Sequence, residues 1–288
     1  MNPSGRRILL VAVAVAIGMP VGSVMGGVTL TDGNSLVEFN FGDDPGEELG
    51  MYEWAVDGVS HMHQQWFWYR VGETGGETSL DTLDMIGGPV IKDTSGDGNA
   101  DAVGVTYGGA GLKVALMFVL VGGPIGSEHS TILETIAATN VGTGTTDLHF
   151  FQYADFDLWY DAEFDSVEII GDPKNTAIQW DGLTYVAETV ATGAGGAPTH
   201  YEAGTWDDSP NSIWDRLQDS QPTTLNDLAG PIEDTDAVWA FQWDKVLGPG
   251  DSLVISKNKI ITPEPATVAL MGLGAAVALA GRRRRPKR

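Results

Sequence analysis

The chain has 288 residues, a net charge of −23 and no cysteine, which excludes disulfides, thiol catalysis and cysteine-ligated metals. A hydrophobic content of 42% with nine tryptophans excludes a disordered chain. All 39 acidic residues lie between Asp32 and Glu264, together with only eight basic ones. This strongly acidic part repels nucleic acid and anionic membrane surfaces, and it favours divalent cations or polymers bridged by them. Carboxylates that only keep the domain soluble are the alternative.

Residues 1–26 have the pattern of a secretory signal peptide. Arg6 and Arg7 precede an apolar run from Ile8 to Ile17, and small residues suited to signal peptidase follow. A run of this length, helical at 1.5 Å per residue, is too short to span about 30 Å of hydrocarbon. We therefore expect export, with removal of this hydrophobic segment near Gly26 or Gly27.

Residues 27–261 form the predicted acidic domain. Short apolar or alternating runs are separated by glycine, asparagine, aspartate and proline, which is typical of antiparallel β-structure. We predict an all-β fold, an antiparallel β-sandwich of about eleven or more strands. The eleven predicted strands cover residues 35–41, 64–71, 102–109, 112–122, 131–141, 148–158, 166–170, 177–182, 184–189, 237–246 and 252–261.

The segment "HMHQQWFWYR" offers two kinds of site on opposite faces of one strand. His61 and His63 share a face and could ligate zinc or copper, with a third ligand from His129, His149 or His200. No second motif supports this, and a partly exposed strand end is the alternative. Trp66 and Trp68 share the other face and could stack on sugar rings. Packing of both tryptophans in the core is the alternative.

The loop "DTSGDGNAD" is the best local motif for a metal. Its spacing can wrap oxygen ligands around calcium, with Gly98 permitting the sharp turn. An EF-hand has a glutamate at position 12, where this chain has Gly104, and the flanks suggest strands. The motif therefore resembles the calcium-binding hairpins of FG-GAP-type repeats, and an empty acidic turn is the alternative. The candidate ligands are Asp93, Ser95, Asp97, Asn99 and Asp101.

Two further segments predict packing. Val114 to Val121 is continuously apolar, and we expect a strand that is buried on both faces. The segment "SPNSIWDRLQD" predicts a helix in which Ser209 caps the first turn.

The segment "YADFDLWYDAEFD" is the richest acidic cluster in the chain. Paired carboxylates could act as acid and base in glycoside hydrolysis, could bind a cation or a partner, or could lie on a solvated corner. Serine nucleophile elbows and phosphate-binding glycine loops are absent from the sequence. An enzymatic role therefore has no positive signal. The acidic residues are Asp155, Asp157, Asp161, Glu163 and Asp165.

Residues 262–288 combine three features of a sorting signal. Pro263, Glu264 and Pro265 precede 16 small or apolar residues, and a basic end containing Arg282, Arg283, Arg284 and Arg285 follows. This arrangement resembles the PEP-CTERM domain recognised by exosortases. The resemblance implies transient membrane insertion through a short hydrophobic helix, cleavage near the triplet, and delivery to the cell surface or extracellular matrix. An ordinary C-terminal anchor is the alternative.

Together these features predict an exported protein, processed by signal peptidase and exosortase, whose body is structural or adhesive and not an enzyme. Carboxylate–calcium bridges to exopolysaccharide would supply the adhesion. A calcium-dependent carbohydrate-binding module using Trp66 and Trp68 is one alternative, and a carbohydrate-active enzyme using the acids of residues 155–165 is another.

Overall fold

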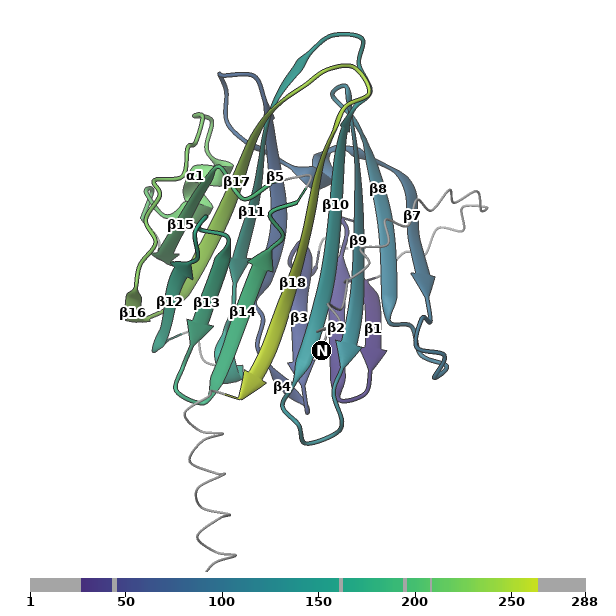
Figure 1. Cartoon of the computed structure of the whole chain (residues 1–288), viewed down its shortest axis with the longest axis vertical. Coiled ribbons are helices and arrows are strands. Elements are labelled where there is room, and N and C mark those ends of the chain that lie inside the picture. The colour runs from purple at the N-terminus through teal and green to yellow at the C-terminus, as the bar shows by residue number, and fades with distance from the viewer. Residues whose placement is uncertain (1–26, 43–45, 161–162, 194–195, 208, 264–288) are drawn as a thin grey trace, which may run out of the picture.

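The computed structural model describes residues 27–42, 46–160, 163–193, 196–207 and 209–263, and these form an all-β sandwich of two antiparallel sheets (Figure 1). The predicted helices of the signal peptide and of the sorting segment lie outside the described residues. Within the ranges given above, no helix has the length and apolar character needed to cross a membrane.

Sheet 1 has nine strands. Seven follow the order β1-β2-β3-β5-β11-β17-β15, while β4 pairs with β3 and β6 pairs with β5. The bounds are β1 Val28–Asp32, β2 Ser35–Asn40, β3 Gly50–Val56, β4 Val59–Ser60, β5 Gln64–Val71, β6 Thr78–Ser79, β11 Thr146–Asp155, β15 His200–Thr205 and β17 Ala237–Leu247.

Sheet 2 also has nine strands, in the order β16-β12-β13-β14-β18-β10-β9-β8-β7. The bounds are β7 Asp84–Lys92, β8 Ala102–Gly109, β9 Leu112–Gly122, β10 Ser130–Asn140, β12 Asp165–Ile170, β13 Thr176–Trp180, β14 Thr184–Val190, β16 Ile232–Thr235 and β18 Ser252–Pro263. The helices among the described residues are the 3-10 turns η1 Leu80–Thr82 and η2 Leu158–Tyr160, and α1 Ile213–Gln218. All eleven predicted strands are found, and the last extends two residues past the predicted domain boundary.

Aromatic side chains fill much of the space between the sheets. Phe156 and Trp239 stack with ring centroids 5.2 Å apart, and Phe67 and Phe150 stack at 5.7 Å. All four side chains are at most 1% exposed. Large rings bury much apolar area, so they supply a major part of the core's stability.

Four charged side chains also lie in this core, and we call them the buried ion square: Glu134, Glu188, Lys257 and Lys259. Lys257 Nζ lies 2.7 Å from Glu134 and 3.0 Å from Glu188, and Lys259 contacts the same two carboxylates. Gln65, Gln152 and Trp239 of sheet 1 complete the hydrogen bonds. Two positive and two negative charges compensate one another there, which a dry interior requires.

The prediction for Val114 to Val121 was wrong. In β9 the burial alternates: Leu116 and Phe118 are 2% exposed, whereas Met117 is 36% and Val121 45% exposed. The strand points one row of side chains between the sheets and the other row outward. A continuous apolar run therefore did not mean that both faces are covered.

Helix α1 covers part of the outer face of sheet 1. Its Trp214 ring lies 5.4 Å from the Trp68 ring and 5.3 Å from the Tyr153 ring. The helix is where the sequence predicted it, but its cap is Ser212 and not Ser209, because the Ser212 hydroxyl accepts the Asp215 amide hydrogen bond at 3.1 Å. Trp68 and Tyr153 consequently lie in a second, smaller apolar layer.

Candidate functional site

Three aspartates from the ends of two neighbouring strands form the strongest candidate site, which we call the carboxylate cluster: Asp155, Asp157 and Asp236. Asp155 ends β11, and Asp236 lies just before β17, which pairs with β11 so that Asp155 is opposite Val238. One carboxylate oxygen from each aspartate lies within 4.8 Å of the others. Antiparallel pairing of β11 and β17 thus brings together acids that are about 80 residues apart in the sequence.

Two oxygens of the carboxylate cluster are buried without a hydrogen bond. The Tyr153 hydroxyl donates to Asp155 Oδ2 at 2.9 Å, but Asp155 Oδ1 and Asp236 Oδ1 have no hydrogen-bond partner among the described residues. Asp155 is only 3% exposed. A buried carboxylate oxygen without a partner carries the full cost of lost hydration, so it needs a proton or a cation.

The electrostatics of the carboxylate cluster point the same way. Burial, followed by repulsion from Asp236 and Asp157, raises the pKa of Asp155 well above its usual range. Burial and then Asp157 raise the pKa of Asp236 to about 6, against a smaller opposing effect of His63. Chemically, this arrangement can take up protons or hold a hard cation on carboxylate oxygens.

The other predicted acids of this segment are not part of the carboxylate cluster. Asp165 begins β12 and is fully buried, and its Oδ2 accepts hydrogen bonds from Gln179 and from the Leu158 amide. Burial raises the pKa of Asp165 to about 8. Glu163 is exposed, and Asp161 lies outside the described residues. Of the five predicted acids, the structure therefore brings two together, and it adds Asp236.

The sequence analysis missed Asp236, because this residue stands in an acidic stretch without a motif. Its only signal was its place directly before the apolar strand 237–246. The pairing of this strand with the strand before Asp157 would have identified Asp236, but neither segment by itself specifies which strands pair.

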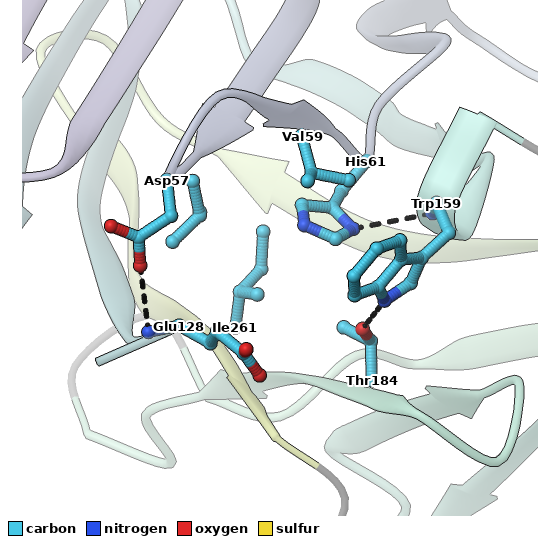
Figure 2. A pocket seen from close by; sticks show the side chains of 8 residues that line it. Asp57, Val59, His61, Glu128, Trp159, Thr184 and Ile261 are labelled. Atoms are coloured by element: carbon cyan, nitrogen blue, oxygen red, sulfur yellow. Dashed lines mark hydrogen bonds between the residues drawn. The ribbon is translucent and has the colours of Figure 1, made fainter. Parts of the chain in front are cut away.

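A small pocket lies at the end of the sandwich where β18 finishes, and Trp159, which follows β11 in the sequence, forms part of its wall (Figure 2). It has a volume of about 210 Å³ and is lined by Val56, Asp57, Val59, His61, Glu128, Trp159, Thr184 and Ile261. Trp159 is 41% exposed, and its indole nitrogen donates to Thr184 Oγ1 at 2.5 Å. We call this the Trp159 pocket.

The backbone at Trp159 is strained, and hydrogen bonds hold both its amide and its side chain. Trp159 has a φ of 58°, in the left-handed region that a bulky residue rarely adopts. Its amide donates to His61 Nδ1 at 3.4 Å, and burial lowers the pKa of His61 to about 4. His61 is therefore neutral at physiological pH, and it serves to position the tryptophan.

The 93–101 loop is a hairpin turn between β7 and β8, as its flanks predicted. Gly98 has a φ of 97°, which gives the sharp turn. Each carboxylate, however, accepts hydrogen bonds from the loop itself: Asp93 from the Gly96 and Gly98 amides, Asp97 from Asn99, and Asp101 from the Thr94 and Ser95 amides. The oxygens are thus engaged with backbone amides, and calcium at Asp93, Ser95, Asp97, Asn99 and Asp101 stays a prediction.

Trp66 and Trp68 are 1% and 3% exposed, so neither ring has a face free for a sugar. Trp66 donates to Ser79 Oγ at 2.9 Å, and Trp68 packs under Trp214. Both tryptophans are therefore packing residues, which was the alternative to sugar stacking in the sequence analysis. The two histidines lie between β4 and β5 and not on one strand face. His61 is buried beside Trp159, whereas His63 is exposed and partly offsets the rise in the pKa of Asp236, so the structure does not bring them together as a pair.

Comparisons with known proteins identify the C-terminus and not the body. Residues 262–285 match the PEP-CTERM protein-sorting motif, so this chain carries an exosortase sorting signal. The motif implies an exported protein that is processed by exosortase and sorted to the cell surface. The body is not assigned to a family, and no curated protein matches the chain.

The chain is similar to several solved structures at low sequence identity. A bacterial glucoamylase complexed with acarbose aligns with a TM-score of 0.53 and 10% identity over 88% of this chain and 36% of its own. A putative aldose 1-epimerase from Escherichia coli K12 gives 0.45 and 12% over 83% and 99%, and a polysaccharide lyase gives 0.43 and 14% over 81% and 33%. The chain thus spans about a third of the glucoamylase, and at 10% identity this likeness shows the fold alone.

Proposed function

We propose that this protein is a surface component delivered by exosortase, whose sandwich has a non-catalytic, structural or adhesive role in the extracellular matrix. Divalent cations held by carboxylates would link the acidic body to exopolysaccharide. The sorting motif supports the destination. The excess of acidic over basic residues in the body supports cation-mediated contacts over direct binding of anionic polymers.

The observation that carries the proposal is the pair of buried, unpartnered oxygens on Asp155 and Asp236. Calcium prefers carboxylate and carbonyl oxygens in a flexible shell, which three aspartates and bound water can supply. At the pH of most natural waters, a calcium ion would replace the protons that these carboxylates otherwise need. The fold would then be more stable with calcium than without it.

The test is thermal unfolding of the full-length protein with a chelator and with excess calcium. A ligand at about 100 times its Kd adds about 2.7 kcal/mol, which corresponds to a rise in Tm of roughly 5–10 °C for a chain of this size. Asp236→Asn keeps the shape but removes the charge, and we expect it to abolish the rise. Asp97→Asn in the 93–101 loop is the matched control and should keep it.

The two variants separate the possible outcomes. Loss of the calcium response in Asp97→Asn with retention in Asp236→Asn would place the ion in the 93–101 loop and contradict the carboxylate cluster as the calcium site. A parent protein whose Tm does not change with calcium would overturn cation-dependent adhesion altogether.

A second candidate function, glycan binding, is favoured by the Trp159 pocket. A half-exposed indole beside a small, partly polar cavity suits the C–H face of a sugar ring. We expect Trp159→Ala to weaken retention on immobilised polysaccharide in affinity electrophoresis. Trp206→Ala removes an equally exposed tryptophan, at 43%, and is the control. Equal retention of both variants and the parent would exclude this pocket as a glycan site.

A further inference from the structure

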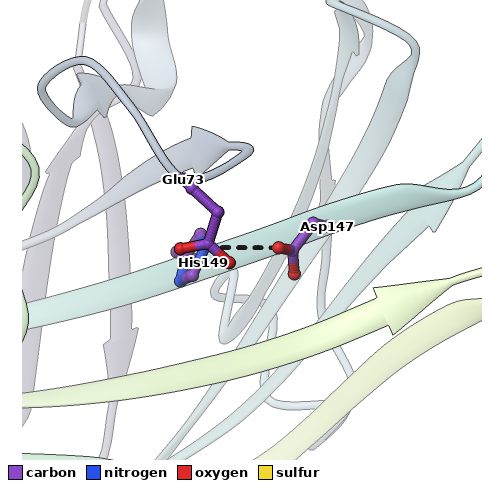
Figure 3. A group of neighbouring side chains, drawn as sticks. All are labelled: Glu73, Asp147 and His149. Carbon is purple, nitrogen blue, oxygen red and sulfur yellow. Dashed lines mark ion pairs between the residues drawn. The ribbon is translucent and has the colours of Figure 1, made fainter.

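His149 lies at the other end of β11 from the carboxylate cluster, among acidic side chains (Figure 3). Asp147 and His149 are two residues apart and share the outer face of sheet 1, and Glu73 reaches them from the turn between β5 and β6. One ligand atom from each of the three lies within 4.8 Å of the others. His149 is 8% exposed, whereas Glu73 is exposed and opens the group to solvent.

One ring nitrogen of His149 is firmly held. Its Nδ1 lies 2.6 Å from Asp244 Oδ1, on the residue directly opposite in β17. Asp244 also accepts hydrogen bonds from Gln242 at 2.8 Å and from Thr199 at 3.1 Å. A carboxylate oxygen accepts hydrogen bonds, so Nδ1 is the donor of this pair, and Nε2 faces the other side of the ring.

The other ring nitrogen, Nε2, is not held by a hydrogen bond of this kind. His149 Nε2 is buried and makes no hydrogen bond to any residue that the structure describes, and its distance to Asp147 Oδ2 is 3.9 Å. An imidazolium would donate to that carboxylate at about 2.8 Å, so 3.9 Å is too long for a proton alone to join them. A lone pair that faces carboxylate oxygens is repulsive unless a cation lies between.

From this geometry we propose that His149 Nε2, Asp147 and Glu73 form a binding site for a divalent transition metal of the zinc class, with Asp244 as the positioning residue. Ligand atoms around a tetrahedral zinc stand about 3.3 Å apart, and the separations here, 3.9 Å from His149 Nε2 to Asp147 Oδ2 and at most 4.8 Å for the other pairs, are somewhat longer. A carboxylate that holds the remote nitrogen of a metal-binding histidine is the usual outer partner of such sites. A nitrogen ligand distinguishes this site from the all-oxygen carboxylate cluster.

The surrounding charges are compatible with this site. Arg70 is opposite His149 on β5, but its guanidinium is taken up by Glu77 at 2.9 Å and by the carbonyls of Gly72 and Thr223. His200 Nε2 lies 3.6 Å from Asp244 Oδ2, whereas His149 contacts the other oxygen of this carboxylate, Oδ1. Three ligands leave at least one position of a tetrahedral site for water or for a donor group on a partner, because Glu73 is exposed and opens the site to solvent.

The test is calorimetric titration of metal-stripped, full-length protein with zinc chloride, in excess calcium to occupy oxygen-only sites. We expect one zinc ion per chain. Glu73→Gln changes an exposed turn and should keep the fold while weakening zinc binding at least about tenfold. Asp244→Asn should weaken it about 10- to 100-fold through loss of orientation. His129→Gln alters an exposed histidine elsewhere and should bind as the parent does.

Cobalt gives an independent readout. Co²⁺ in a low-coordinate site with a nitrogen ligand should produce visible absorption bands in the parent, and these should disappear in His149→Gln. Zinc affinity unchanged in both Glu73→Gln and His149→Gln would overturn the proposal. So would the absence of zinc binding by the parent, because His149 would then be only a buried, hydrogen-bonded core residue. Neither result bears on calcium at the carboxylate cluster.

Discussion

Each lysine of the buried ion square touches both glutamates, so removing one carboxylate leaves two ammonium groups to share the other. Glu188→Gln should therefore lower the free energy of unfolding by about 3–5 kcal/mol, the usual cost of breaking a buried pair on one side. The effect is checked by denaturant titration. Glu128→Gln, at an exposed position, should change stability by less than about 0.5 kcal/mol. Equal stability of the two variants would show that the square contributes nothing.

A pH dependence follows from Asp165. Its pKa in the folded state, about 8, lies above the ordinary value of 3.8, so the native protein holds a proton that the unfolded chain releases. The corresponding stabilisation is complete below about pH 3.8 and is lost as the pH rises to about 8. Asp165→Asn does not titrate. With a chelator present, the Tm of this variant relative to the parent should therefore rise by several degrees from pH 5 to pH 8.

Comparing variant with parent isolates Asp165, since His61 and the carboxylate cluster contribute to both proteins. The lowered pKa of His61 by itself makes stability rise between pH 4 and pH 6.5, which is the opposite direction. A Tm difference that is constant from pH 5 to pH 8 would mean that Asp165 is ionised throughout this range.

The buried ion square was present in the sequence as a pattern. Glu134 stands between Ile132 and Ile136, and Lys257 between Ile255 and Lys259, all at the spacing of one strand face. The alternation alone places these charges on the inner side. What it cannot supply is the pairing of β10, β14 and β18, which decides that opposite charges meet. The same limit explains why Asp155 was predicted in an acidic site and Asp236 was not.

At the level of elements, strongly patterned strands were predictable, whereas the irregular edge strand β7 was predicted only as the flank before the 93–101 loop. β7 contains Gly87, Gly88 and Pro89, and its pairing with β8 shifts register twice. It lies at the edge of sheet 2, where proline and a broken register are tolerated because one side needs no partner. The sequence therefore indicated this strand only through its position before the loop motif.

β9 illustrates the reverse error. Its apolar run suggested two covered faces, yet only the row containing Leu116 and Phe118 is buried. Strand periodicity reports which residues share a face, but the number of layers on top of a sheet is a property of the tertiary structure. For sheet 1 the second layer is partly provided by α1, whose Trp214 made Trp68 a packing residue.

The whole molecule has two distinct ends. β11 and β17 run antiparallel, and the short turn at 248–251 leads from β17 into β18, so Thr146, Leu247 and Ser252 lie at one end (Figure 1). The chain leaves the sandwich at Pro263, at the opposite end. The carboxylate cluster and the Trp159 pocket are near Pro263, whereas His149 is near the 248–251 turn. While the sorting segment is inserted, we therefore expect the proposed zinc site to face away from the membrane.

β18 takes part both in the folding of the sandwich and in the sorting of the protein. This strand lies between β14 and β10 in the middle of sheet 2, brings both lysines of the buried ion square, and continues directly into the sorting motif. Translation delivers it after every other strand described. A polypeptide that stops short of residue 252 would leave Glu134 and Glu188 without counter-charges and would also lack the signal. We therefore expect a truncated chain neither to fold stably nor to reach the cell surface, because the same segment supplies the lysines and leads into the sorting signal. Only a chain translated to its end would be displayed.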